Sequence, residues 1–236
     1  PGTMGVITHM AGPAVSLQLG LRTEMPMQIV MVDRASRLNC SRQLVEMHHD
    51  RKRVFIDQLG WQLPAAGSWL EVDQYDTEYT VYLIACSPTD QRHLASVRLN
   101  PTTRPHMLDT VFADLCEGGP VIGTDVWESS RFTIAPIGLR GLEVMRLSQY
   151  LALAHVEFAL LNGLTRYTMI GETHRVATVI SMGWKVRPLC LPRECEGNRI
   201  QALEVTIDEE TLVTMRRRFR VDHEVLFVPQ PLGVAA

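Results

Sequence analysis

The feature that most constrains the fold is an apolar segment at 126–134, followed by a glycine-containing turn and a long apolar helix at 141–162. The segment has the composition of a strand inside a sheet, yet it carries Glu128 and Arg131. Charged side chains are rarely buried in such a strand unless they form ion pairs or take part in binding or catalysis. Gly138 and Gly141 open the helix, whose free N–H groups attract anions such as phosphate. An acid able to accept a proton therefore lies beside a place able to hold a phosphate.

The alternation of side chains along this strand bears on the roles of its two charges. Successive strand residues point to opposite faces, so Glu128 and Ser130 share one face and Arg131 lies on the other. A β-bulge would bring Arg131 to the face of Glu128. Two interpretations stay open from the strand alone: each charge forms a structural ion pair, or each takes part in chemistry.

Composition excludes several classes of protein. Hydrophobic residues make up 46% of the 236 residues and charged residues 21%, which is ordinary for a soluble globular protein. The net charge of −3 provides no attraction to nucleic acid or to an anionic membrane, and we expect neither partner. The five cysteines are scattered and odd in number, which argues against a disulfide framework and a zinc site. We expect no metal and a reducing cytoplasm.

Hydrophobic periodicity predicts an α/β fold with one sheet. Residues 1–26 lack periodicity and are expected to form a flexible extension, and 27–236 to form a single domain. Strand, helix and strand in succession predict a parallel crossover, so the sheet is expected to be antiparallel early and parallel late. The predicted strands are 28–32, 78–86, 93–99, 126–134, 167–171, 184–191 and 200–207, and the predicted helices are 41–59, 141–162, 173–182 and 208–219.

A second group of candidate residues lies earlier in the chain. Arg51 falls on the apolar stripe of its helix, one turn before Phe55, so its guanidinium is expected to point inward. Asp73 and Asp76 follow Trp61, and acids beside aromatic rings suit a cationic ligand. A metal site and a solvated turn are the alternatives for these two acids.

Taken together, the motifs are more specific than any one of them. Their order along the chain is Arg51-x-x-x-Phe55, Leu59-Gly60-Trp61, Glu71-x-Asp73-x-Tyr75-Asp76, Ser96-Val97-Arg98-Leu99, Phe112, and Glu128-Ser129-Ser130-Arg131-Phe132. This set resembles the LuxI-type acyl-homoserine-lactone synthases, the autoinducer synthases of bacterial quorum sensing. The resemblance covers about 28–184.

The resemblance implies a fold and a reaction. The fold is similar to that of the GNAT acetyltransferases, a mixed sheet that is splayed in the middle and flanked by helices. The reaction transfers an acyl group from an acyl thioester to the α-amine of S-adenosylmethionine. The methionine carboxylate then closes a lactone and releases methylthioadenosine. No cofactor is implied beyond these two substrates, and the location implied is the bacterial cytoplasm.

The resemblance also implies roles for individual residues. An α-ammonium cannot attack a thioester, so a base is needed, and Glu128 is expected to serve directly or through one water. Arg131 is expected to order the site by pairing with an acid. The residues expected to shape the S-adenosylmethionine pocket are Arg51, Phe55, Trp61, Asp73, Asp76, Arg98 and Phe112, with Arg51 or Arg98 on the substrate carboxylate.

The acyl and pantetheine site is expected at Ile134, Gly138, Arg140, Gly141 and Met169. Relatives that use 3-oxo acyl groups often have a threonine near Met169, so we expect an acyl group without a 3-oxo substituent. The glycine turn favours CoA as the donor, but an acyl carrier protein stays open as an alternative donor and partner.

Two other functions also stay open: another GNAT-type N-acyltransferase with a different amine acceptor, and a non-catalytic ligand-binding protein of this fold.

Overall fold

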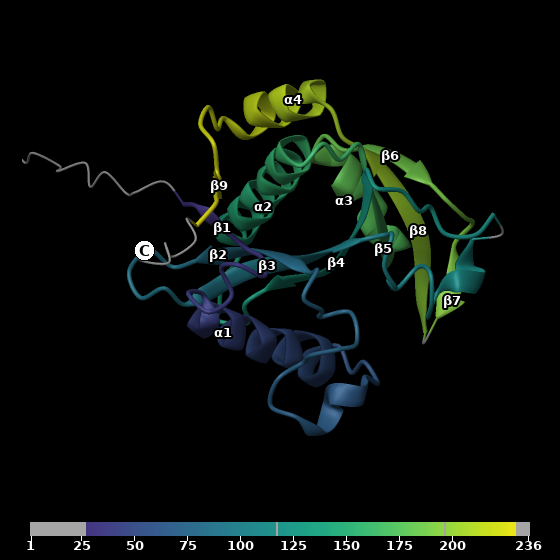
Figure 1. Ribbon diagram of the computed structural model, residues 1–236, viewed down its shortest axis with the longest axis horizontal. Helices are drawn as coiled ribbons and strands as arrows, with labels where there is room; N and C mark the ends of the chain where they lie inside the picture. Colours follow the sequence, from purple (N-terminus) through teal and green to yellow (C-terminus); the bar gives the residue numbers. More distant parts are fainter. Residues whose placement is uncertain (1–26, 117, 196, 230–236) are drawn as a thin grey trace, which may run out of the picture.

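A computed structural model describes residues 27–116, 118–195 and 197–229. They form one sheet of nine strands in the order β6-β8-β5-β4-β3-β2-β1-β9, with β7 paired to β8 (Figure 1). The strands are β1 (Ile29–Val32), β2 (Val81–Cys86), β3 (His93–Pro101), β4 (Val126–Ile134), β5 (Arg166–Glu172), β6 (Lys185–Pro188), β7 (Arg193–Cys195), β8 (Asn198–Thr206) and β9 (Leu226–Phe227). The predicted 1–26 extension lies outside the described residues.

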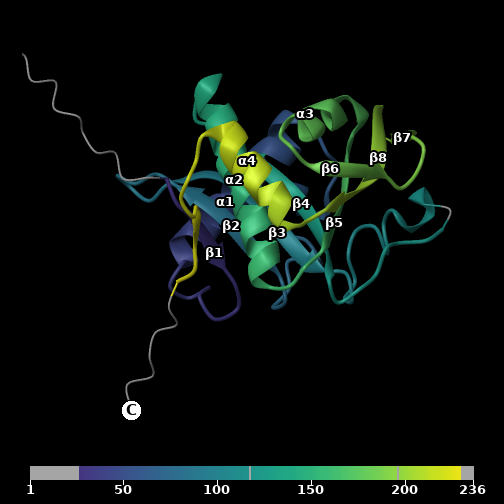
Figure 2. The same ribbon diagram turned by 90° about the horizontal axis from the view of Figure 1, so that it is seen from above.

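Helices cover both faces of this sheet. The helices are α1 (Ser41–Arg51) with its π-helical continuation η1 (Lys52–Gln58), α2 (Leu142–Leu161), α3 (Val176–Ser181) and α4 (Glu209–Phe219), with 3-10 turns η2 (Pro64–Gly67), η3 (Ala113–Leu115) and η4 (Thr173–Arg175). Figure 1 shows α1 against one face and α2 against the other, and Figure 2 shows α4 lying over α2. Because α2 is apolar around most of its surface, it packs between the sheet and α4 and forms the centre of the main core.

The sheet divides between β4 and β5. These strands pair in parallel at Val126 with Arg166, Trp127 with Tyr167 and Glu128 with Thr168, and no further pair follows although both strands continue. The remaining residues of β4 stay paired with β3, while those of β5 stay paired with β8. The expected mixed sheet, splayed in the middle, is therefore confirmed, and the division begins at Glu128.

The expectation of a parallel late sheet was wrong. β5 and β6 do run in the same direction, but β8 lies between them and is antiparallel to both. β8 has nine residues and β6 only four, so the longer strand completes far more hydrogen bonds beside β5. Only β4 with β5 and β1 with β9 are parallel among the described strands.

A β-bulge in β4 changes the direction of Arg131. Arg98 of β3 pairs with Ser130, and Ser96, two residues away, pairs with Thr133, so β4 contains one extra residue. Arg131 has φ of 54°, a value that residues with a side chain rarely adopt. Its guanidinium meets the same carboxylate, Asp73, as that of Arg98. The bulge therefore places Arg131 on the α1 face, where regular alternation would have directed it toward α2.

Candidate active site

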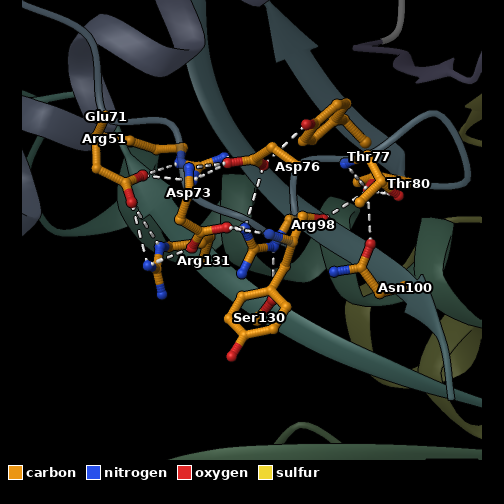
Figure 3. Close-up of polar contacts among 12 residues, drawn as sticks. Arg51, Glu71, Asp73, Asp76, Thr77, Thr80, Arg98, Asn100, Ser130 and Arg131 are labelled. Atoms are coloured by element: carbon orange, nitrogen blue, oxygen red, sulfur yellow. Dashed lines mark hydrogen bonds and ion pairs between the residues drawn. The ribbon is translucent and has the colours of Figure 1, made fainter. Parts of the chain in front are cut away.

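Six charged side chains form a closed ring on the α1 face of the sheet (Figure 3). Positive and negative groups alternate around it, and each carboxylate contacts the arginines on both sides. In order, the ring is Arg51, Glu71, Arg131, Asp73, Arg98 and Asp76, which closes on Arg51. Three positive and three negative charges cancel, so burying the ring leaves no net charge.

The contacts within the ring have the geometry of strong ion pairs. Arg51 binds Asp76 through two parallel hydrogen bonds of 2.9 and 3.0 Å. Arg131 donates to Glu71 at 3.1 and 3.2 Å and to Asp73 at 2.7 Å. The flanking guanidiniums of Arg51 and Arg98 hold the pKa of Asp76 well below its usual range, against the opposing effect of burial. Asp76 is therefore ionised near neutral pH.

The arginines come from regular elements and the acids from one loop. Arg51 ends α1, Arg98 lies in β3 and Arg131 in β4, whereas the three acids lie between η2 and β2. The loop is also tied to α1 through its backbone, because the N–H of Glu71 donates to the carbonyl of His48 at 3.0 Å. Rigid elements thus fix the positive groups, and these order the loop that contributes the negative ones.

An aromatic pair adjoins the ring. Phe55 and Trp61 are stacked, with centroids 4.7 Å apart and planes inclined by 24°. The π-helical turn η1 brings them together, since the N–H of Trp61 donates to the carbonyl of Phe55 at 2.9 Å. The guanidinium carbon of Arg131 lies 5.5 Å from the Phe55 centroid and 5.8 Å from that of Trp61. The pair provides flat apolar surfaces beside a partly exposed acid, Asp73.

Glu128 is buried at the point where the sheet divides. Its two carboxylate oxygens accept hydrogen bonds from the backbone N–H groups of Met107, at 3.1 Å, and Leu108, at 2.9 Å. Burial raises its pKa, and the two N–H donors oppose that rise only in part. A large cavity spans this division of the sheet, and among the described residues Met107 lines it whereas Glu128 does not. The acid therefore lies directly behind Met107.

The sulfur of Met107 meets two arginine donors for which the described part of the chain offers no stronger acceptor. It lies 3.6 Å from Nη2 of Arg98 and 3.7 Å from Nη1 of Arg131. A thioether is a weak acceptor, and a methionine side chain has three rotatable bonds. Displacing this side chain would open two converging guanidinium groups to an anion. By contrast, all three guanidinium nitrogens of Arg51 already donate to carboxylates, Nε to Glu71 and both Nη atoms to Asp76.

One cavity of about 1470 Å³ spans the division of the sheet. On the α1 side it is lined by Phe55, Trp61, Asp73, Met107, Phe112 and Arg131, and on the α2 side by Ile134, Ala152, His155, Met169, Met182 and Trp184. Small-molecule sites usually have volumes of about 300–1,000 Å³. This cavity is large enough for two substrates. Charged and aromatic residues line its α1 side and mostly apolar residues its α2 side, and charged or polar residues of β5, η4, β7 and β8 also line it: Glu172, Arg175, Arg193, Glu194 and Asn198.

The turn before α2 only partly matches the anion site expected there. Gly138 and Gly141 have φ of 86° and 51°, which explains why glycine occupies both positions. Gly138 lines the cavity, whereas Arg140 and Gly141 do not appear among its described lining residues. Glu143 lies in the first turn of α2 and accepts from the N–H of Arg140 at 3.4 Å. This carboxylate already opposes the positive helix end, which weakens the attraction for a phosphate.

Sequence reasoning missed two parts of this arrangement. Glu71 appeared in the motif but was given no role, although it is fully buried between Arg51 and Arg131. Its place in the motif, two residues before Asp73, was the available signal. His155, a buried polar residue within the apolar part of α2, was not considered for the cavity.

The described residues contain no group of three or more His, Cys, Asp or Glu side chains arranged to hold a metal ion. The metal alternative for Asp73 and Asp76 is therefore unsupported, and their carboxylates bind arginines. None of the described helices has the length and apolar character to cross a membrane.

A mixed sheet divided at its centre, with a cavity at the division, defines a GNAT-like fold. The model of the autoinducer synthase family matches residues 35–215, and the chain belongs to this family.

Similar proteins include named synthases. An isovaleryl-homoserine lactone synthase of Bradyrhizobium diazoefficiens is 32% identical over 75% of this chain and 77% of its own length. An acyl-homoserine-lactone synthase of Ralstonia solanacearum is 46% identical, but the match spans 36% of this chain and only 42% of that protein. The solved CoA-dependent synthase BjaI, with SAM and isopentyl-CoA, has a TM-score of 0.79 at 28% identity, over 87% of this chain and 95% of its own.

Proposed function

We propose that residues 27–236 form a single catalytic domain that synthesises an acyl-homoserine lactone for quorum sensing. The observation that supports this most directly is the single cavity that joins a charged, aromatic chamber to an apolar one across the divided sheet. A sulfonium nucleoside fits the first chamber and an acyl chain the second. Their reacting groups would meet at the division, beside Glu128.

The aromatic and charged chamber would bind S-adenosylmethionine. The Phe55–Trp61 stack offers surfaces for the adenine ring and the sulfonium, and Asp73 contributes negative charge beside them. The substrate carboxylate would replace the sulfur of Met107 between Arg98 and Arg131. Of the two arginines considered from the sequence, Arg98 is therefore favoured. Arg51 and Asp76 would act through the shape of the ring, and Phe112 would line the pocket.

Glu128 would be the base for the first step. With the substrate bound in place of the Met107 side chain, the carboxylate of Glu128 would accept a proton from the α-ammonium, directly or through a water. The free amine attacks the thioester carbonyl, a C–N bond forms, and the thiol leaves as the tetrahedral intermediate collapses. A raised pKa suits this role, since it brings the proton affinity of Glu128 closer to that of the amine.

The second step needs no external base. A carboxylate oxygen of the acylated methionine attacks the γ-carbon of its own side chain, which is bonded to the sulfonium. A C–O bond forms, and the bond from this γ-carbon to sulfur breaks with its electron pair passing to sulfur. Methylthioadenosine and the lactone are the products. The enzyme would accelerate this ring closure by holding the carboxylate and the γ-carbon in the orientation that the attack requires.

We favour an acyl-CoA as the donor. Support comes from the similar protein BjaI, which is CoA-dependent, and from the open glycine turn at Gly138 on the cavity wall. The carboxylate of Glu143 at the start of α2 argues against tight phosphate binding there, so an acyl carrier protein stays an alternative donor. The five cysteines are all free, which suits a cytoplasmic location in a bacterium.

The test is incubation of the purified protein with S-adenosylmethionine and a panel of acyl-CoA thioesters or acylated carrier protein. The expected result is an acyl-homoserine lactone and methylthioadenosine in equal amounts by mass spectrometry. Acylation of a different amine without methylthioadenosine would indicate another GNAT-type N-acyltransferase. Binding without turnover of any donor would indicate a non-catalytic protein.

A further inference from the structure

A polar pair lies in the mostly apolar chamber on the α2 side of the cavity. Ser129 of β4 and His155 of α2 both line the cavity, and Oγ of Ser129 lies 3.1 Å from Nε2 of His155. Other residues that line the α2 side of the cavity are apolar, namely Ala152, Met169, Met182 and Trp184, and the ring centroid of Trp184 lies 5.9 Å from that of His155. A polar pair placed among such groups is positioned to recognise a specific feature of a ligand.

The hydrogen-bond direction within the pair is fixed by the other side of the imidazole. Nδ1 of His155 lies 2.7 Å from the carbonyl oxygen of Leu151, which can only accept, so Nδ1 carries a proton. Burial lowers the pKa of His155 to about 4, so the ring is neutral near pH 7. Nε2 therefore has a free lone pair, and the hydroxyl of Ser129 donates to it.

The serine oxygen consequently presents only acceptor lone pairs to the cavity. A ligand hydroxyl can donate to this oxygen while the serine keeps its bond to His155. A ligand ketone cannot donate. To bind the ketone, Ser129 would have to turn its hydroxyl away and leave the buried Nε2 without a partner, at a cost on the order of tenfold to a hundredfold in affinity.

We propose that Ser129 and His155 select acyl thioesters that carry a hydroxyl on carbon 3 and discriminate against the 3-oxo form. This rests on the proposed synthase function. Ser129 follows Glu128 directly, about 3.3 Å further along β4, and its side chain points to the opposite face of the sheet, toward α2. An acyl chain that runs from the division beside Glu128 into the α2 chamber therefore passes Ser129 within a few bonds of its carbonyl. Acyl chains without a substituent on carbon 3 leave the hydrogen bond between Ser129 and His155 intact, and their kcat/KM should lie between those of the 3-hydroxy and 3-oxo forms.

The test compares three CoA thioesters of one chain length: unsubstituted, 3-hydroxy and 3-oxo. Methylthioadenosine release gives kcat/KM for each. We expect the 3-hydroxy form to exceed the 3-oxo form by at least tenfold in the natural protein. Ser129→Ala should abolish the preference for the 3-hydroxy form, so that the two kcat/KM values become similar. His155→Leu should raise the 3-oxo form relative to the others, because the freed hydroxyl can donate to a ketone. His155→Gln, whose amide oxygen can accept from Ser129, should retain much of the ratio.

Ser148→Ala is the matched control, since Ser148 lines the same cavity but donates to the carbonyl of Val144 on its own helix. Its 3-hydroxy to 3-oxo ratio should match that of the natural protein. As a readout independent of turnover, nitrogen NMR of the His155 ring should show Nδ1 protonated and Nε2 bare between pH 6 and 8.

Equal turnover of the 3-oxo and 3-hydroxy forms by the natural protein would overturn the selectivity and leave the synthase function standing. An Nε2-protonated ring would overturn it too, since Ser129 would then accept. A protein that releases no methylthioadenosine with any donor would overturn both.

Discussion

The carboxylate of Glu71 accepts two hydrogen bonds from Arg131, although sixty positions separate the two residues in the chain. Glu71 is fully buried, and its other oxygen is bound to Arg51. Glu71 thereby links Arg131 of β4, whose φ is positive, to Arg51 at the end of α1. Through this contact the acidic loop, the helix and the central strand form one structural unit around the proposed S-adenosylmethionine site.

Glu71→Gln should destabilise the fold. The substitution leaves Arg51 and Arg131 buried with one carboxylate fewer, and breaking a buried ion pair on one side costs about 3–5 kcal/mol. Urea denaturation measures the free energy of unfolding. Glu78→Gln is the control, because Glu78 pairs with Arg34 at the exposed surface and should cost no more than about 1 kcal/mol. Equal effects of the two substitutions would contradict the structural role of the ring.

Arg98→Lys should act mainly on substrate binding. A lysine cannot reproduce the fork of donors that meets Asp73, Ser130 and the position proposed for the substrate carboxylate. We expect KM for S-adenosylmethionine to rise by about tenfold or more, with a smaller change in KM for the acyl donor. Steady-state kinetics with each substrate varied in turn measure the two effects. An equal rise in both constants would argue against a carboxylate site at Arg98.

Acid should destabilise the protein through Asp76. Its pKa is lower in the folded protein than the unfolded value of about 3.9, so ionised Asp76 stabilises the fold above that value. This contribution is lost as the pH falls below about 4, because the unfolded chain then takes up a proton that the folded protein does not. Urea titrations between pH 3 and 7 should show the loss. In Asp76→Asn, which is destabilised throughout, this part of the pH dependence should disappear.

Activity should have an acidic limb set by Glu128. Because burial raises its pKa, the carboxylate becomes ionised only above the ordinary value of about 4.3. The profile of kcat/KM against pH should therefore fall as the pH drops through this raised value. An acidic limb that is unchanged in Glu128→Asp would argue for a different titrating group.

The effect of Glu128 on stability has the opposite sign to that of Asp76. Ionising Glu128 opposes folding, so its contribution to the free energy of unfolding falls as the pH rises from the unfolded pKa toward the raised pKa of the folded protein.

Much of the fold followed from periodicity, and the departures have physical causes. The segment 126–134 is the central strand, and 141–162 corresponds closely to α2, because long apolar patterns with glycine boundaries leave few alternatives. The position of β8 between β5 and β6 was not predictable in the same way. Strand order depends on pairing between segments distant in the chain, and periodicity carries no information about it.

The sequence indicated where some candidate residues lie better than it indicated what they contact. The inward direction of Arg51 followed from its place on the helix stripe, and it is buried. That Arg131 shares a face with Ser130 depends on a bulge that no local pattern indicated. The position of Glu128 behind Met107 depends on a loop conformation. Both features arise from tertiary contacts, which a single sequence does not encode in its local spacing.

The most direct test of the central claim separates the two chemical steps in Glu128→Gln. The glutamine keeps the size of the side chain but cannot take a proton from the amine, and loss of a general base costs about 10²–10⁴ in rate. Supplied with S-adenosylmethionine and an acyl-CoA, the variant should release methylthioadenosine at least a hundredfold more slowly than the natural protein. Supplied with N-acyl-S-adenosylmethionine, whose amine is already acylated, it should form the lactone at close to the natural rate. Equal loss of both reactions, or full acylation by the variant, would contradict the role assigned to Glu128.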